Sequence, residues 1–126
     1  MRLKQLVFGF MLFTCILLVF GCEPPPTHIL YITDFSCIAR DAAGNIIDPL
    51  WLFPGDRVVW VNSSNREVTV KFEDERAFGM EEWTIASGRR EIVYVKAEEE
   101  MAVDYIITPC EDPPGTPKAI FPPPPP

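Results

Sequence analysis

Histidine is almost absent from this sequence: His28 is the one histidine among 126 residues. Catalytic dyads and triads use an imidazole as the base that activates serine or cysteine. His28 stands alone just after a proline-rich segment, where we expect a solvated side chain at the edge of a strand. No other pairing of side chains points to a reaction, so we predict that this protein is not an enzyme.

Basic residues are also few. The chain has 11 Lys and Arg against 18 Asp and Glu, a net charge of -7. Phosphate binding needs a basic surface, so we expect no nucleic-acid partner, and the acidic balance argues against a domain lying flat on an anionic membrane. The acidic runs at 73–75 and 98–100 lack the ligand spacing and glycine of a calcium loop. We interpret them as solvated turns, of a kind that attracts basic protein partners.

The sequence lacks any segment of about ten residues with the period of an amphipathic helix. It has instead short apolar-rich segments separated by turn residues, which are typical of strands. The predicted strands cover 28–32, 36–40, 50–53, 57–62, 66–72, 82–86, 91–96, 102–108 and 118–121. Strands at this spacing predict an all-β fold, a two-sheet β-sandwich over residues 28–121.

A long apolar run occurs near the N-terminus. Arg2 and Lys4 precede an uncharged run from Leu6 to Phe20, and Gly21 stands directly before Cys22. This is the anatomy of an export signal, and the Gly-Cys junction resembles the lipobox of bacterial lipoproteins. We therefore predict a signal peptide at 1–21 and lipid attachment at Cys22. The alternative is an uncleaved signal anchor, although about fifteen apolar residues are few for a bilayer that takes about 20.

Proline-rich segments flank the predicted domain. Residues 22–27 join the lipidated cysteine to three prolines, a short stiff linker, and residues 122–126 form a polyproline tail that cannot join a β-ladder. We expect an exported protein, lipid-anchored in the bacterial cell envelope. Glu23 rather than Asp follows Cys22, which favours the outer membrane if the cell is Gram-negative. The expected partners are the membrane, through the anchor, and an envelope protein.

The stretch from Pro54 to Phe72 has the clearest local structure. Pro54-Gly55-Asp56 is turn chemistry, because proline presets φ, glycine accepts a positive φ and aspartate bonds nearby backbone. Val58, Val59, Trp60 and Val61 follow as a strand. After the polar residues 63–65, the alternation of VTVKF at 68–72 predicts a half-buried antiparallel strand.

These motifs resemble those of the cupredoxins, small Greek-key sandwiches such as plastocyanin and amicyanin that hold one copper ion for electron transfer. The resemblance rests on FPGDRVVWVN at 53–62, VTVKF at 68–72, SGRREIVYV at 87–95, AVDY at 102–105 and KAIF at 118–121. It covers essentially the whole of residues 28–121 and implies a cupredoxin-like Greek key of two sheets.

The copper ligands that the resemblance implies are missing. Aligned on the family pattern, Val68 takes the place of the first histidine, Ile107 that of the cysteine and Cys110 that of the second histidine, with Pro113 near the methionine. A blue-copper centre needs two imidazoles and a thiolate. We therefore expect no cofactor. The alternatives are an altered copper site and a Cu(I) site of soft ligands drawn from Cys110, His28, Met80 and Met101.

Cysteine pairing offers another use for Cys110. With Cys15 removed in the signal and Cys22 acylated, Cys37 and Cys110 remain as an even pair in an exported chain. They form either a disulfide, which we favour, or two buried free thiols. The sequence thus predicts a cell-envelope lipoprotein whose cupredoxin-like domain has lost its copper site and acts as a binding or structural module. The alternatives are a copper-binding electron-transfer protein with an altered site and an immunoglobulin-like surface module.

Overall fold

The computed structural model describes residues 26–111 and 115–123. Within them the chain forms eight strands and one 3-10 turn and has no helix that is long and apolar enough to cross a membrane. The strands are β1 Thr27–Ile32, β2 Leu50–Trp51, β3 Arg57–Asn62, β4 Val68–Phe72, β5 Glu82–Ile85, β6 Arg90–Tyr94, β7 Met101–Thr108 and β8 Lys118–Phe121, with the turn η1 at Glu75–Ala77. The all-β prediction is confirmed.

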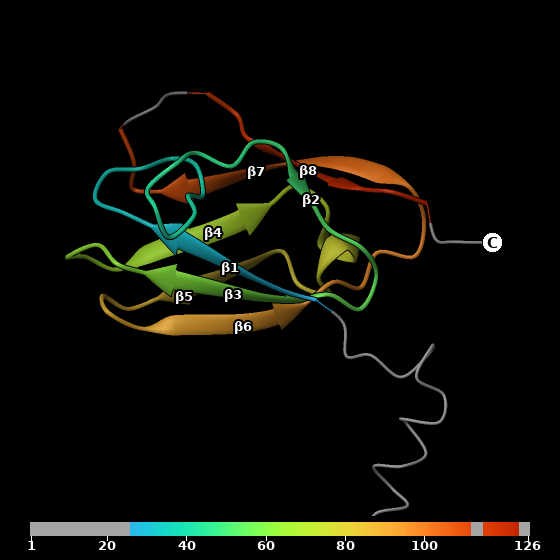
Figure 1. Cartoon of the computed structure of the whole chain (residues 1–126), viewed down its shortest axis with the longest axis horizontal. Helices are drawn as coiled ribbons and strands as arrows, with labels where there is room; N and C mark the ends of the chain where they lie inside the picture. The colour runs from blue at the N-terminus through green and yellow to red at the C-terminus, as the bar shows by residue number, and fades with distance from the viewer. Residues whose placement is uncertain (1–25, 112–114, 124–126) are drawn as a thin grey trace, which may run out of the picture.

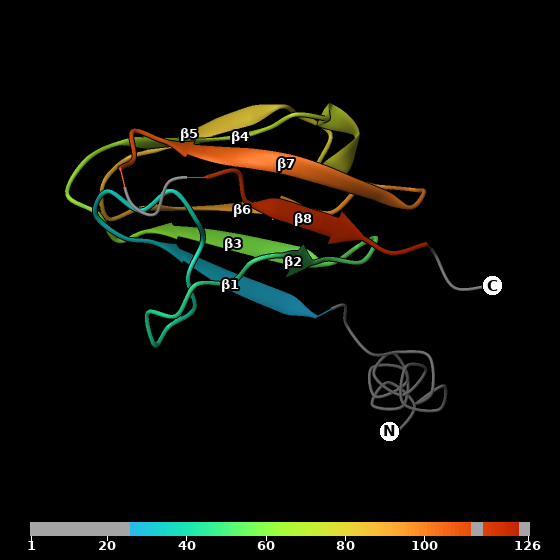
Figure 2. The ribbon, with the colours of Figure 1, turned by 90° about the horizontal axis from the view of Figure 1, so that it is seen from above.

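The strands form two sheets that face each other (Figures 1 and 2). The three-stranded sheet has the order β1-β3-β6, with β1 parallel to β3, and the five-stranded sheet has the order β2-β8-β7-β4-β5. This confirms the predicted two-sheet sandwich. The immunoglobulin fold instead places its first, second, fourth and fifth strands together in one sheet. The pairing of the first strand with the third therefore excludes the immunoglobulin-like alternative.

The core lies between the sheets and is centred on Trp60. Its ring lies edge-on or tilted against those of Phe72, Tyr105 and Trp83, with centroids 6.2, 5.8 and 6.0 Å away. These side chains arrive from both sheets because alternate residues of each strand point inward, as predicted for Val68, Val70 and Phe72. The aromatic cluster joins the two sheets across the centre of the domain.

One predicted strand is wrong. Residues 36–40 form only isolated bridges, in which Arg40 pairs with Tyr31 and with Ile46. Phe35 just before them has a φ of 60°, and the Ser36 hydroxyl donates to the Ile38 carbonyl at 2.8 Å. Such local side-chain bonding competes with a strand ladder, so an apolar-rich segment became a buried loop.

Several predicted segments fall outside the described residues. They are the signal peptide at 1–21, the lipid-attachment residue Cys22 with most of the linker 22–27, Pro113, and the last three residues of the tail 122–126. The predictions made for them remain predictions.

Candidate functional site

The two ends of the sandwich differ in their chemistry. We call the end where β1 and β3 begin the proximal end and the end where β4 begins and β7 finishes the distal end; they lie at the right and left of Figure 1. Val68, Ile107 and Cys110, three of the positions aligned with the copper site, lie at the distal end. The single histidine lies at the proximal end.

Val68 and Ile107 are neighbours at the distal end. In the antiparallel pairing of β4 with β7, Thr69 lies opposite Thr108 and Val70 opposite Ile107. Val68 and Ile107 are 2% and 0% exposed and belong to the central hydrophobic cluster. Aliphatic side chains cannot coordinate a metal, and at these two positions they contribute to the core instead.

Cys110 is bonded to Cys37 in a disulfide, with 4.9 Å between their Cα atoms. The structure thus contains the bond that the sequence favoured over two free thiols. A disulfide sulfur carries no thiolate, the form of cysteine that binds metals. The bond also indicates an oxidising, extracytoplasmic environment, where structural disulfides persist.

The loop that leads into β4 is organised by Asn62, which is fully buried. Its Nδ2 donates to the carbonyls of Arg66 and Ile85 at 2.8 and 2.9 Å, and its Oδ1 accepts from the Ser64 amide and hydroxyl at 2.9 and 2.6 Å. The Ser87 hydroxyl donates to the Ser64 carbonyl at 2.7 Å. This network ties the loop to the β5–β6 connection, so side-chain hydrogen bonds hold the backbone before Val68.

Phe35 and Arg66 cover the outside of the distal end. The Arg66 guanidinium carbon lies 4.5 Å from the centre of the Phe35 ring, a cation–π contact. The Phe35 carbonyl accepts from the Glu111 amide at 2.8 Å, which joins the 33–37 loop to the segment that carries Cys110. The disulfide and these contacts hold the two segments together.

His28 has a different environment from the solvated one that we expected. Its Nε2 lies 2.7 Å from Oδ2 of Asp56, and its side chain is 30% exposed while that of Asp56 is 3% exposed. The same carboxylate oxygen accepts from the Phe53 amide at 2.9 Å. The correction follows from strand pairing, because β1 lies beside β3 and so brings His28 next to the turn that contains Asp56.

The soft-ligand set considered from sequence does not come together. Met101 begins β7, at the opposite end from the disulfide that contains Cys110, and His28 also lies at the proximal end. Across residues 26–111 and 115–123, no three side chains of His, Cys, Asp or Glu lie close enough to hold a metal ion. The sulfur of Cys110 and the imidazole of His28 therefore lie at opposite ends of the domain.

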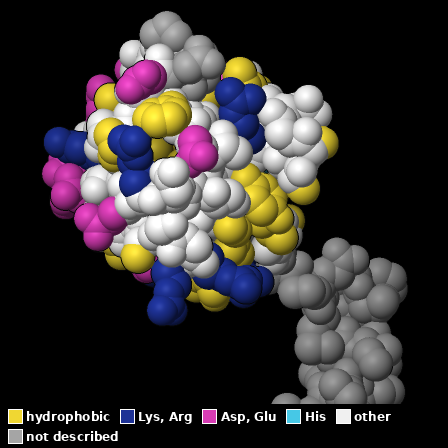
Figure 3. All heavy atoms as spheres, turned by 90° about the vertical axis from the view of Figure 1, so that its left-hand side faces the viewer, with side chains coloured by type: hydrophobic (Ala, Val, Ile, Leu, Met, Phe, Trp, Pro, Cys, Tyr) yellow, Lys and Arg dark blue, Asp and Glu magenta, His cyan; other side chains and the backbone are white. Residues whose placement is uncertain are grey.

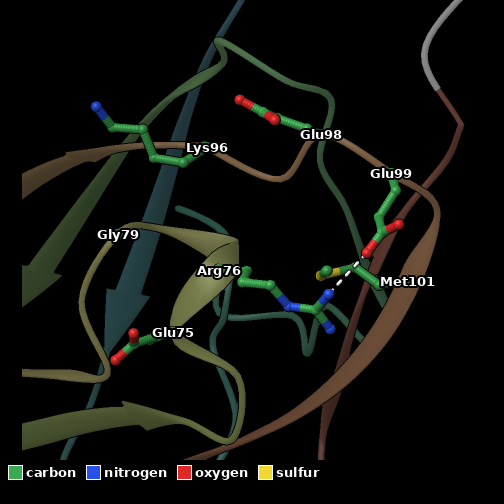
Figure 4. A pocket seen from close by; sticks show the side chains of 7 residues that line it. All are labelled: Glu75, Arg76, Gly79, Lys96, Glu98, Glu99 and Met101. Carbon is green, nitrogen blue, oxygen red and sulfur yellow. Dashed lines mark hydrogen bonds and ion pairs between the residues drawn. The ribbon is translucent and has the colours of Figure 1, made fainter.

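A shallow groove of about 630 Å³ lies at the proximal end (Figure 4). Arg76 lines this groove, and its guanidinium forms ion pairs with Asp74 at 2.6 Å and with Glu99 at 2.7 Å. Its positive charge is therefore balanced by carboxylates of the chain itself. The side-chain and backbone hydrogen bonds from Arg76 lower the pKa of Asp74 to about 2. Glu75, Glu98 and Lys96 also line the groove, so its rim carries three carboxylates and two basic side chains. This rim matches the predicted solvated acidic turns.

Comparisons with known proteins give a limited result. No protein-family model and no curated protein matches the sequence. Among solved structures, the chain is similar to a variant of the multicopper oxidase McoA from the hyperthermophile Aquifex aeolicus, with a TM-score of 0.46 and 11% identity. The similarity covers 79% of this chain and 29% of that one, so this chain spans less than a third of its length. The fold assignment rests on the strand pairing described above.

Sequence reasoning missed the role of the buried Asn62, and for Asp56 it predicted the bond to nearby backbone but not the burial or the bond to His28. Both are at most 2% exposed. Each stands next to turn residues, and that position was a usable signal, since asparagine and aspartate beside turns bond backbone groups. Their distant partners, Ile85 and His28, could not be read from local sequence.

Proposed function

We propose that this chain is a cell-envelope lipoprotein whose cupredoxin-like domain lacks a copper centre and acts as a binding or structural module. One observation carries the proposal. At the positions where the family resemblance places ligands, the chain has two buried aliphatic side chains, Val68 and Ile107, and a disulfide sulfur, that of Cys110.

The donor chemistry at those positions does not suit copper. Electron-transfer copper sites use two imidazoles and one thiolate with a weak axial ligand. The one histidine of the chain, His28, lies at the proximal end and is bonded to Asp56. A rearrangement that brought it to Val68 would have to dismantle β1, whose residues pair with β3 from Thr27 to Ile32.

The anchoring part of the proposal is supported by sequence. Gly21-Cys22 at the end of the charged and apolar N-terminal segment resembles a lipobox. The disulfide supports export, since disulfides are rare in the bacterial cytoplasm. Two or more acyl chains on Cys22 would hold the domain firmly on a membrane.

A copper-retention experiment tests the proposal. The full chain is purified in detergent from the membranes of bacteria that express it, loaded with Cu(II) or Cu(I), dialysed and assayed for metal. We expect no stoichiometric copper and no visible charge-transfer band of a Cu(II)–thiolate bond. One retained copper per chain would instead establish the altered-site electron carrier.

Mass spectrometry of the N-terminal peptide provides the control for this experiment. An unacylated Cys22 would supply a free thiol that binds copper adventitiously, so only acylated protein is informative. The His28→Ala variant, measured in parallel, shows whether residual copper sits on the lone imidazole. A chain with an unmodified Cys22 in the native envelope would contradict the anchor.

A further inference from the structure

The outward face of the three-stranded sheet is apolar and carries no acidic residue. Side chains alternate along each strand, so the residues between the buried ones of β1, β3 and β6 point away from the core. Its apolar members are Ile29, Tyr31, Val59, Val61, Ile92 and Tyr94. We call this surface the outer face.

Apolar side chains of the outer face form a band across the three strands, exposed on β1 and β6 and buried in the middle, on β3. Ile29 lies opposite Val59, and Val59 lies opposite Ile92, so the three residues cross the sheet in one row. A groove lined by Ile29 and Trp51 extends the band to β2. Ile29 and Ile92 are 48% and 40% exposed, whereas Val59 between them is 3% exposed. Trp51, on the edge strand of the other sheet, is 56% exposed. Soluble proteins seldom leave such an apolar band without a partner.

The charges on the outer face are all positive. Arg57 and Arg90 stand in the rows on either side of the band, and together with Arg89 they line a second groove, over the sheet itself. Among the described residues, none of the three arginines forms an ion pair. In Figure 3, which looks onto the distal end, hydrophobic side chains gather at the right with basic side chains above and below them, and most acidic side chains lie toward the left. The net charge of the chain is negative, but the outer face carries only positive charges.

The outer face also adjoins the point where the chain leaves toward Cys22. The Arg57 amide donates to the Pro26 carbonyl at 3.1 Å, so the segment before β1 lies against β3. Four residues separate Cys22 from Thr27, and an extended chain advances at most about 3.5 Å per residue. A lipid anchor on Cys22 would therefore keep the start of β1 within about 18 Å of the bilayer surface.

We propose that the outer face rests on the anionic phospholipid surface of the membrane that holds the anchor. This inference rests on the proposed lipidation of Cys22. Arginines bind the phosphate headgroups, and the apolar band with Tyr94 and Trp51 lies at the depth that amphipathic aromatic side chains favour. The tether makes the contact intramolecular, so modest surface affinity is enough.

Trp51 provides a direct reporter of this contact. The chain has three tryptophans, and Trp60 and Trp83 are 0% and 6% exposed. The acylated full chain is reconstituted into phosphatidylcholine vesicles with or without phosphatidylglycerol, each containing a lipid brominated near its headgroup. We expect the bromine to quench most Trp51 emission in anionic vesicles only, and high salt to reverse the effect. Trp51→Phe should remove the quenchable component.

Charge variants test the role of the arginines. Each basic residue near an anionic surface contributes roughly a fivefold factor, so R57Q with R90Q should weaken the contact about thirtyfold. Lys71→Gln with Lys118→Gln removes the same charge from the five-stranded sheet and should leave quenching unchanged. Near-ultraviolet circular dichroism verifies that each variant folds.

The outcomes separate this inference from the proposed function. Acylated protein without Trp51 quenching in anionic vesicles would overturn the membrane contact and leave the lipoprotein assignment standing. Equal quenching with and without phosphatidylglycerol would overturn the role of charge. A dimer in detergent that R57Q with R90Q dissociates would show that a second copy covers the outer face. An unmodified Cys22 would overturn the proposed anchor and this inference together.

Discussion

Replacing Asn62 with alanine tests how the distal end is held together. The substitution removes four hydrogen bonds, two donated to the Arg66 and Ile85 carbonyls and two accepted from Ser64. A typical hydrogen bond contributes about 1 kcal/mol net, and unpaired buried groups cost more. We therefore expect the free energy of unfolding to fall by about 4 kcal/mol. Whole domains usually have a free energy of unfolding of roughly 5–15 kcal/mol, so this loss is a large part of the total.

Chemical denaturation of the full chain measures this loss. The denaturation midpoint of N62A should fall while the slope with denaturant stays unchanged, because the surface exposed on unfolding is almost the same. Asn62→Asp separates the two halves of the network. It keeps an acceptor for Ser64 but turns a carboxylate oxygen toward the two carbonyls, so we expect it to be at least as destabilising as alanine.

Asn65 provides the matched control, because it is an exposed asparagine in the same loop. N65A should change the free energy of unfolding by no more than about 0.5 kcal/mol. A loss below about 1 kcal/mol for N62A, or equal losses for the two variants, would refute the view that buried side-chain bonds hold this end.

Three further predictions concern the rest of the domain. Cys37→Ala with Cys110→Ala removes a crosslink between residues 73 apart in sequence; the chain-entropy relation gives a loss of about 4 kcal/mol, and thiol labelling of the unfolded wild-type chain should find neither cysteine free. Asp56→Ala removes two hydrogen bonds at a buried carboxylate and should cost about 2–3 kcal/mol in denaturant unfolding; a loss under about 0.5 kcal/mol would contradict it. Arg76 lowers the pKa of Asp74 from 3.8 to about 2. The stability that Asp74 contributes is therefore complete above pH about 4 and is lost as the pH falls through about 2. An NMR titration in which Arg76→Gln leaves the pKa of Asp74 unchanged would contradict the assignment of this shift to Arg76.

The strands and turns were largely predictable from local sequence. The alternation at 68–72 predicted the buried and exposed sides of β4 correctly, and the β-branched residues at 58–61 predicted strand β3. Gly55 has the positive φ expected of the turn before β3. The loop at 36–40 was not predictable in this way, because its apolar residues are buried by contacts with distant segments and not by a strand ladder.

The candidate site was predictable in part. Alignment with a family pattern showed that Val68 and Ile107 stand where copper ligands would be. The structure adds that both side chains are buried in the same core cluster. An even count of cysteines favoured the Cys37–Cys110 bond. The partner of His28 was not predictable, since Asp56 is 28 residues away and its proximity depends on the parallel pairing of β1 with β3.

The sequence by itself determined the class of fold, the turns and the shortage of histidine ligands, since these depend on residue type and short-range period. Only the tertiary structure decided which strands pair, and pairing gathers Arg57, Arg90 and the apolar row of Ile29 into one face free of acidic side chains. The physical reason is that alternation assigns each residue to a side of its own strand, whereas the neighbours of that side come from segments far apart in the chain.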